Sequence, residues 1–161
     1  MKKIIATVGF ALTMGISSLT SVTAETFQRE GWVSMETKHA FADLNKRLSA
    51  AIKANKMGRV NTASASGGAK RRKLTIAGNR VVGVYNNIFA VRMLKASKAA
   101  GMEAPIIFYL TENQDGTTAL SYKKPSFVFE PYYADAKPDL KVMAAELDVI
   151  FAKIAADASA N

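Results

Sequence analysis

The chain has 161 residues, one histidine and no cysteine, and its 22 lysines and arginines outnumber its 13 aspartates and glutamates, for a formal charge of +9. Without cysteine the chain has no disulfide, no thiolate nucleophile and no cysteine-ligated metal. The length fits a single domain with a core of its own.

The first 24 residues have the pattern of a cleavable export signal. A pair of lysines precedes an uncharged apolar stretch over 4–16, and the small residue Ala24 ends the polar segment that follows. The apolar stretch is shorter than the roughly 20 residues of a membrane-spanning helix. We expect cleavage after Ala24, a mature domain over 25–161 in the periplasm or outside the cell, and no transmembrane segment in that domain.

The first half of the mature chain predicts a strand, a helix and a second strand. Bulky residues indicate a strand over 25–36. Apolar residues at helical spacing then predict a helix over 38–56, with Thr37 as its N-cap. Weak alternation over 59–66 predicts the second strand, which two glycines end.

The second half adds a strand and a helix, then a hairpin and a final helix. The β-branched run at 80–85 predicts a buried strand, and Asn87 is expected to cap a helix over 87–100. An Asp-Gly turn inside 105–123 predicts a β-hairpin. Aromatic residues after it suggest a loop, and a regular apolar stripe predicts a last helix over 138–156.

This order, β-α-β-β-α-β-β-α, predicts an α+β fold. Strands in pairs separated by helices favour two layers, a sheet of about five strands with helices mainly on one face. The chain from 25 to 161 then forms one domain.

The stretch from Arg80 to Pro131 resembles the DUF302 family of small domains. The features that match are an Asn-containing turn after a strand, a helix, a strand led by Pro105, the Asp-Gly hairpin, and a Leu-Ser-Tyr segment followed by Pro125. The resemblance implies a two-layer α/β fold that is often dimeric. The family turn is typically Gly-Asn-Pro, whereas this chain has Tyr-Asn-Asn at 85–87.

The turn formed by Tyr85, Asn86 and Asn87 is the first candidate for a binding site. A strand ends and a helix begins there, and free backbone N–H groups at a helix start can hold an anion. Tyr122, on the second strand of the hairpin, could approach the turn. The alternative is a capping turn without a ligand.

A compact basic run is the second candidate, and it consists of Lys70, Arg71, Arg72 and Lys73. It is either a solvated loop or short helix, or a patch that recruits a polyanion or the headgroups of an anionic membrane. No aromatic residue is interleaved with it, so stacking on single-stranded nucleic acid is not expected.

No pattern in the chain predicts a catalytic or metal centre. His39 is the single histidine, too few nitrogen ligands for a zinc or copper site, and the mature chain's methionines do not cluster along the sequence. We expect no metal and no cofactor. The residues favour a non-catalytic binding or accessory domain for a small anion, a polyanion or a protein partner. The alternative is an enzyme with a shallow site near Asn86 and Tyr122.

Overall fold

A computed structural model describes residues 29–161, so the expected signal sequence and its cleavage after Ala24 lie outside the described residues. Two 3₁₀ helices, at Ala99–Glu103 and Glu130–Tyr132, accompany the main elements. The main elements are β1 (Trp32–Thr37), α1 (Phe41–Ala54), β2 (Gly58–Ala63), α2 (Ala65–Arg71), β3 (Asn79–Tyr85), α3 (Asn87–Ala96), β4 (Ile106–Glu112), β5 (Thr118–Lys123), α4 (Pro125–Phe129) and α5 (Asp139–Ser159).

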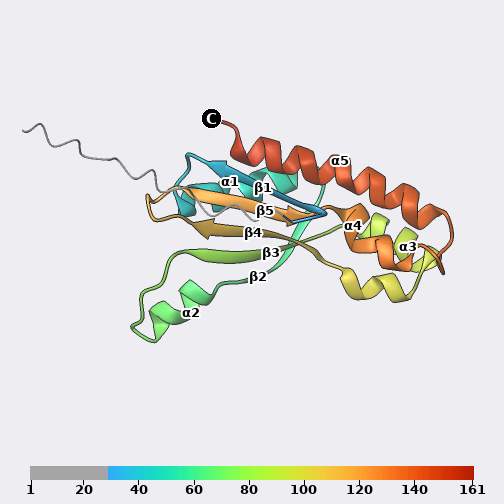
Figure 1. Cartoon of the computed structure of the whole chain (residues 1–161), viewed down its shortest axis with the longest axis horizontal. Helices are drawn as coiled ribbons and strands as arrows, with labels where there is room; N and C mark the ends of the chain where they lie inside the picture. Colours follow the sequence, from blue (N-terminus) through green and yellow to red (C-terminus); the bar gives the residue numbers. More distant parts are fainter. Residues whose placement is uncertain (1–28) are drawn as a thin grey trace, which may run out of the picture.

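The five strands form one antiparallel sheet in the order β1-β5-β4-β3-β2. The helices α1 and α5 pack on one face of this sheet, and α5 runs along most of the length of the molecule, where α3 and α4 pack against it beyond the ends of the strands (Figure 1). The predicted α+β class and two-layer arrangement are confirmed. Within residues 29–161, no helix is both long and apolar enough to cross a bilayer.

The core lies between the sheet and these helices. Every second residue of the central strands faces it, as in Phe108 and Leu110 of β4 and Leu120 of β5, all fully buried. The ring of Phe108 stacks on that of Phe151 from α5 with their centroids 5.0 Å apart. Burial of such large side chains holds α5 on the sheet, and truncating one of them to alanine typically costs about 3–5 kcal/mol.

Three local expectations were wrong. Thr37 does not cap α1, because it is the last residue of β1 and its hydroxyl donates to the carbonyl of Thr118 at 2.7 Å. The cap position belongs to Ala40, whose side chain makes no capping bond. The expected aromatic loop after β5 begins with the short helix α4, and the helix expected over 87–100 ends at Ala96 before a 3₁₀ turn.

A glycine directly before β1 lets the chain pass under an aromatic ring. Gly31 has a φ of +70°, and a Cβ built on it would lie 2.0 Å from the ring of Phe127 in the segment after β5. Only a residue without a side chain fits both the backbone angle and the contact. Gly31 therefore fixes where the chain enters the sheet.

Candidate functional site

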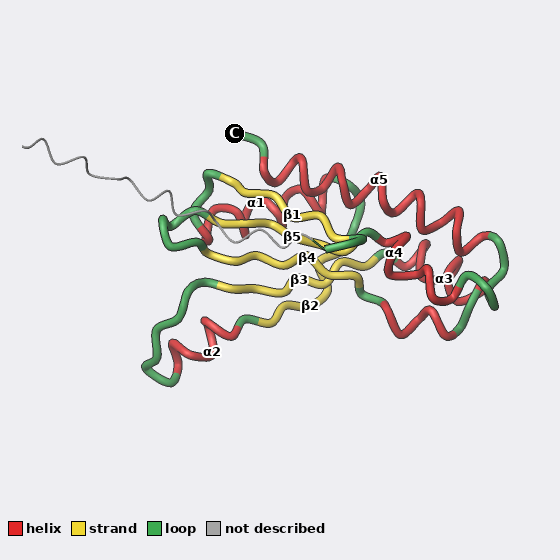
Figure 2. The backbone as a smooth tube through the Cα atoms, viewed as in Figure 1, coloured by secondary structure: helices red, strands yellow, loops and turns green. Residues whose placement is uncertain are grey.

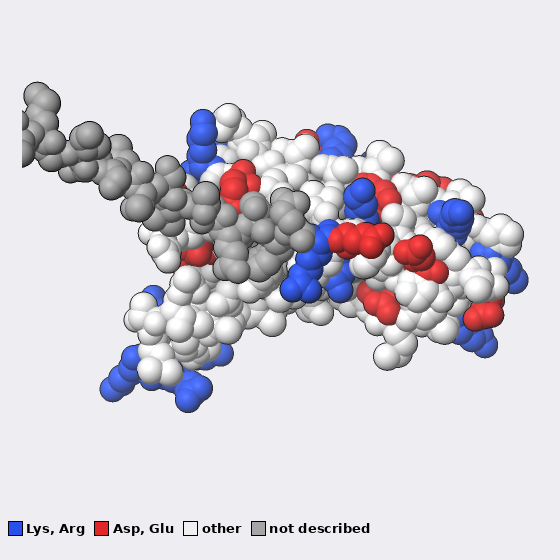
Figure 3. Space-filling view, in the orientation of Figure 1, with Lys and Arg blue, Asp and Glu red and all other residues white. Residues whose placement is uncertain are grey.

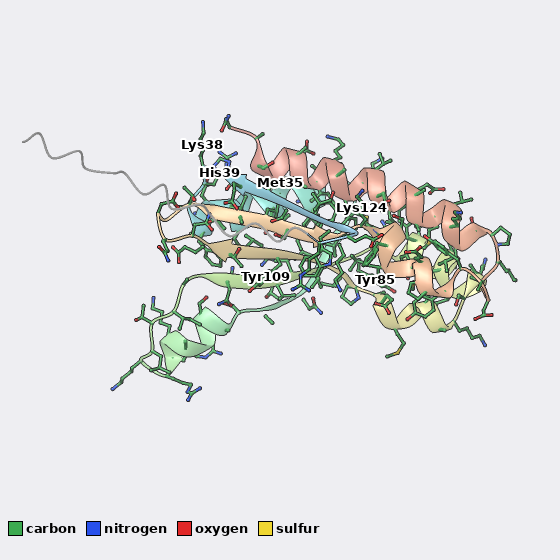
Figure 4. The ribbon with its side chains drawn as sticks, in the orientation of Figure 1. Met35, Lys38, His39, Tyr85, Tyr109 and Lys124 are labelled. Carbon is green, nitrogen blue, oxygen red and sulfur yellow. The ribbon has the colours of Figure 1, made fainter. Side chains whose placement is uncertain are left out.

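The tip of β3 borders a small cavity between the sheet, α3 and α5. Tyr85 and Asn86 form its polar rim, and Tyr85 lies toward the other end of the sheet from His39 (Figure 4). The cavity has a volume of about 30 Å³, which is space for about one or two water molecules. Its remaining lining is apolar: Met57, Val84, Phe89, Ala90, Met93, Ala104, Ile106, Phe129, Met143, Leu147 and Phe151.

Asn86, not Asn87, caps α3. The Oδ1 atom of Asn86 accepts from the N–H groups of Ile88 at 2.8 Å and Phe89 at 3.4 Å, while its Nδ2 donates to the carbonyl of Lys56 at 2.9 Å. Asn87 is the exposed first residue of the helix. The expected cap was therefore one residue off. Because Asn86 already accepts from these two N–H groups, fewer free backbone N–H donors remain at the start of α3 to bind an anion.

Tyr122 does not line this cavity. Its ring packs between Phe108, 5.0 Å away, and Phe151, 5.9 Å away, in the core. Burial, and to a lesser extent the carboxylate of Asp148, raise the pKa of the Tyr122 phenol above its usual value. The structure thus brings Tyr85 and Asn86 together at one rim and places Tyr122 and the exposed Asn87 elsewhere.

Three methionines that are distant in the sequence line this cavity together: Met57, Met93 and Met143. Sequence spacing alone could not reveal this, because they come from the connection between α1 and β2, from α3 and from α5. Their flexible thioether side chains fill an irregular part of the core. Within residues 29–161, no group of three or more His, Cys, Asp or Glu side chains is placed to hold a metal.

His39 joins two helices. Its Nε2 lies 2.9 Å from the carbonyl oxygen of Ala160 and its Nδ1 lies 3.4 Å from a carboxylate oxygen of Asp43. These contacts tie the start of α1 to the end of α5. The described contacts therefore give His39 a structural role.

The basic run lies on a segment that extends away from the sheet, here called the basic arm (residues 64–78). The arm connects β2 to β3 and contains α2 (Figures 1 and 2). It has four cations and no carboxylate, and the blue atoms at its tip have no red atoms beside them (Figure 3). All four cations are exposed, and none makes an ion pair within residues 29–161.

Hydrogen bonds at its base fix the arm on the sheet. Ser64 caps α2 by accepting from the N–H of Gly67, and its hydroxyl donates to the carbonyl of Asn79 at 2.7 Å. The side-chain oxygen of Asn79 accepts from the N–H of Ala65, and the backbone N–H of Asn79 donates to the hydroxyl of Ser66. No residue of α2 is buried. Polar contacts at the base, rather than apolar packing, therefore orient the arm.

A groove of about 540 Å³ separates the arm from the body, here called the arm groove. Lys70 lines it from the arm and Arg80 lines it from β3, with the Arg80 guanidinium 5.6 Å from the centre of the Phe41 ring. The carboxylate of Glu112 also lines the groove, where it accepts from the N–H of Gly78 at 2.7 Å. The groove thus has two cations and one hydrogen-bonded carboxylate.

The side chain of Arg59, from β2, places a second guanidinium close enough to Arg80 for the two charges to interact. Its guanidinium bonds the neutral side chains of Ser49 and Asn45. Partial burial, and then the charge of Arg80, lower the pKa of Arg59 from its usual value. Arg59 and Arg80 are therefore neighbouring cations, and the hydrogen bonds of Arg59 go to neutral side chains rather than to a carboxylate.

A model of the family described as "Domain of unknown function DUF302" matches residues 33–158. The chain belongs to the DUF302 family. A solved relative, the crystal structure of an uncharacterized conserved DUF302 protein from Bacillus stearothermophilus, is 19% identical and has a TM-score of 0.68. That match covers 78% of this chain and 96% of the other, and at this identity it shows the shared fold. No curated protein matches the chain.

The DUF302 match includes both the cavity and the basic arm, so the resemblance seen in the sequence is confirmed. Sequence reasoning found the four cations of the arm but missed Phe41, Arg80 and Glu112, which the fold brings to the groove. It also missed Leu74 and Ile76, which line the groove beside the cations. The sequence did contain a signal for these two residues. Leu74 and Ile76 are apolar residues on either side of Thr75, directly after the basic run.

Proposed function

We propose that this DUF302 protein is exported and acts as a non-catalytic binding module that holds a polyanionic partner through its basic arm. The observation that carries the proposal is the arm itself. Four exposed cations without carboxylate partners lie on a projection that hydrogen bonds orient. Multivalent anions are the partners that such a surface attracts, at short range and in a salt-dependent way.

Concentrated charge supports binding better than it supports solubility alone. Like charges placed next to one another repel, so a surface that serves only solubility gains more from dispersing them. Four consecutive cations on one small projection instead raise the local potential that a polyanion meets. Two of them are arginines, which can bind phosphate oxygens through two parallel hydrogen bonds.

Export is part of the proposal and rests on the N-terminal pattern. Cleavage after Ala24 would leave Glu25 as the new N-terminus and a mature domain with a charge of +7, since 20 basic and 13 acidic residues remain. N-terminal sequencing of protein from the expressing cell tests this directly. Material from the cytosol that still begins with Met1 would refute it.

A small polar ligand at Tyr85 and Asn86 has less support. The adjoining cavity is about 30 Å³, below the several hundred Å³ of ordinary ligand pockets. Both polar atoms of the Asn86 amide are used in hydrogen bonds. The dimer that the family resemblance implies stays a prediction, and analytical ultracentrifugation would measure it.

The test of the binding function compares two variants of equal net charge. In the first, Lys70, Arg71, Arg72 and Lys73 are changed to serine. In the control, four exposed lysines at the other end of the molecule are changed to serine: Lys95, Lys98, Lys137 and Lys141. Both variants lose four charges, so an effect of net charge alone would be the same in both.

Binding is measured with polyphosphate chains at low salt, by fluorescence anisotropy. We expect the arm variant to lose most of the affinity, the control variant to lose little, and the remaining affinity to fall as salt is added. Equal losses in the two variants would refute the proposal, and so would an unchanged protein that binds neither polyphosphate nor anionic vesicles at low salt. Thermal unfolding of both variants checks that the fold is intact.

A further inference from the structure

The basic arm also exposes large apolar side chains. Leu74 and Ile76 follow the four cations directly and are 53% and 49% exposed. They line the arm groove, together with Lys70 and Thr75. Water does not favour such side chains on the most protruding part of a molecule, and exposed apolar groups of this kind often mark a contact surface.

Cations beside exposed apolar side chains match the surface of an anionic bilayer better than they match a soluble polyanion. A soluble polyanion satisfies the cations but offers nothing to Leu74 and Ile76. The interface of an anionic bilayer satisfies both, because phosphate groups meet the cations and the acyl boundary accepts the apolar side chains. Lysine and arginine can also keep their charged ends at headgroup level while their methylene stems lie deeper.

We infer that the polyanionic partner of this protein is the surface of an anionic lipid bilayer, which the four cations of the basic arm meet while Leu74 and Ile76 enter its interface. This inference rests on the proposed function, because it names the partner of the same arm. The arm extends beyond the body of the molecule, so it can reach a flat surface before other elements do (Figure 1).

The arm groove gives this contact a place for single headgroups. Its volume of about 540 Å³ lies within the usual range for small-molecule sites. Lys70 and Arg80 approach it from two sides, and Leu74 and Ile76 form the wall next to them. A lipid phosphate between these cations would direct its acyl chains past the apolar wall. Glu112 lies in the same groove and opposes the anion, although the N–H of Gly78 compensates part of its charge.

The experiment separates the bilayer from a soluble polyanion. Vesicles of phosphatidylcholine, with or without one third phosphatidylglycerol, are floated with the full mature protein, and polyphosphate binding is measured in parallel. The test variant changes Leu74 and Ile76 to serine. The matched control changes Val142 and Val149, which are 56% and 70% exposed on α5, to serine.

We expect the unchanged protein to bind the phosphatidylglycerol vesicles and not the neutral ones. The Leu74→Ser/Ile76→Ser variant should lose roughly tenfold in vesicle partitioning, since the burial of two half-exposed aliphatic side chains is lost. Its polyphosphate binding should stay unchanged. The control variant should match the unchanged protein in both measurements. Removing the four cations should weaken vesicle binding by more than tenfold, because each cation near an anionic surface contributes about fivefold.

Three outcomes would overturn the inference. If the unchanged protein binds polyphosphate but not anionic vesicles, the partner is a soluble polyanion and the proposed function stands without the bilayer. If the Leu74→Ser/Ile76→Ser variant partitions like the unchanged protein, the two apolar side chains do not enter the interface, and the inference fails while the proposed function stands. If the unchanged protein binds neither probe at low salt, the proposed function fails, and the inference fails with it.

Discussion

Changing Asn86 to alanine should destabilise the domain, because this one side chain serves two segments. Its Oδ1 caps α3 through the N–H groups of Ile88 and Phe89, and its Nδ2 donates to the carbonyl of Lys56. Loss of an asparagine cap costs about 1 kcal/mol, and loss of a hydrogen bond such as the second costs another ~1 kcal/mol. The sum is about 2 kcal/mol in the free energy of unfolding.

The Lys56 bond has a second consequence. Lys56 itself has a φ of +59°, which a residue with a side chain rarely adopts, and its carbonyl is held by Asn86. Asn86→Asp keeps the capping oxygen but removes the donor, so it should lose about half as much stability as Asn86→Ala. This variant separates the contribution of the cap from that of the link between α3 and the turn that precedes β2.

Urea unfolding followed by circular dichroism measures these losses, with a thermal scan beside it. A loss of 2 kcal/mol should lower the melting temperature by roughly 6–10 °C for a domain of this size. The matched control is Asn87→Ala, because Asn87 is exposed and is the first residue of α3. Its change should stay within about 0.5 kcal/mol. Equal losses for Asn86→Ala and Asn87→Ala would show that the capping argument is mistaken.

Two further predictions concern the ion pairs between α3 and α5 and a strained turn. The carboxyls of Asp139 and Glu146 have pKa values below their usual range, first because Arg92 hydrogen-bonds each of them. The stability from these pairs is therefore present above the ordinary carboxyl pKa and is lost as the pH falls below about 4. The difference in melting temperature between the unchanged protein and Arg92→Met should shrink between pH 6 and pH 3, and a constant difference would contradict this account. Gly31→Ala should cost about 1 kcal/mol more than Gly116→Ala. Both glycines have positive φ, but a Cβ at Gly31 meets an aromatic ring whereas one at Gly116 meets nothing within 4 Å. Equal costs in urea unfolding would show that the ring moves aside freely.

The sheet and the main helices could be predicted because their side chains report burial directly. The run from Arg80 to Tyr85 is rich in β-branched residues and forms all of β3 except its first residue, Asn79. The apolar stripe beginning at Leu140 forms the buried face of α5. These patterns extend over several turns or strand residues, so one atypical residue does not hide them.

Boundaries and caps were harder because they depend on single hydrogen bonds. Thr37 and Asn87 are both suitable N-cap residues by type. In the structure, the hydroxyl of Thr37 serves the neighbouring strand, and the cap of α3 falls to Asn86. Two adjacent asparagines look alike in a sequence. Which of them caps the helix is decided by the carbonyl of Lys56, 30 residues away, which only the Asn86 amide reaches.

The candidate site was only partly visible for a similar reason. The four cations of the basic arm are adjacent in the sequence, so their cluster needs no fold to bring it together. Arg80 and Glu112 reach the arm groove from β3 and β4, and Phe41 reaches it from α1. No sequence pattern links these positions before the register of β3 against β4 is known.

The separation of the arm from the core has a physical consequence for its function. The buried residues of the core lie in the sheet and the covering helices, while α2 buries none of its residues. Substitutions on the arm therefore change its charge and apolar surface with little effect on the free energy of unfolding. The hydrogen bonds of Ser64, Ser66 and Asn79 still hold the base of the arm in one orientation. An orientation maintained by polar contacts, on an element that contributes no buried residue, serves contact with something outside the molecule better than it serves stability.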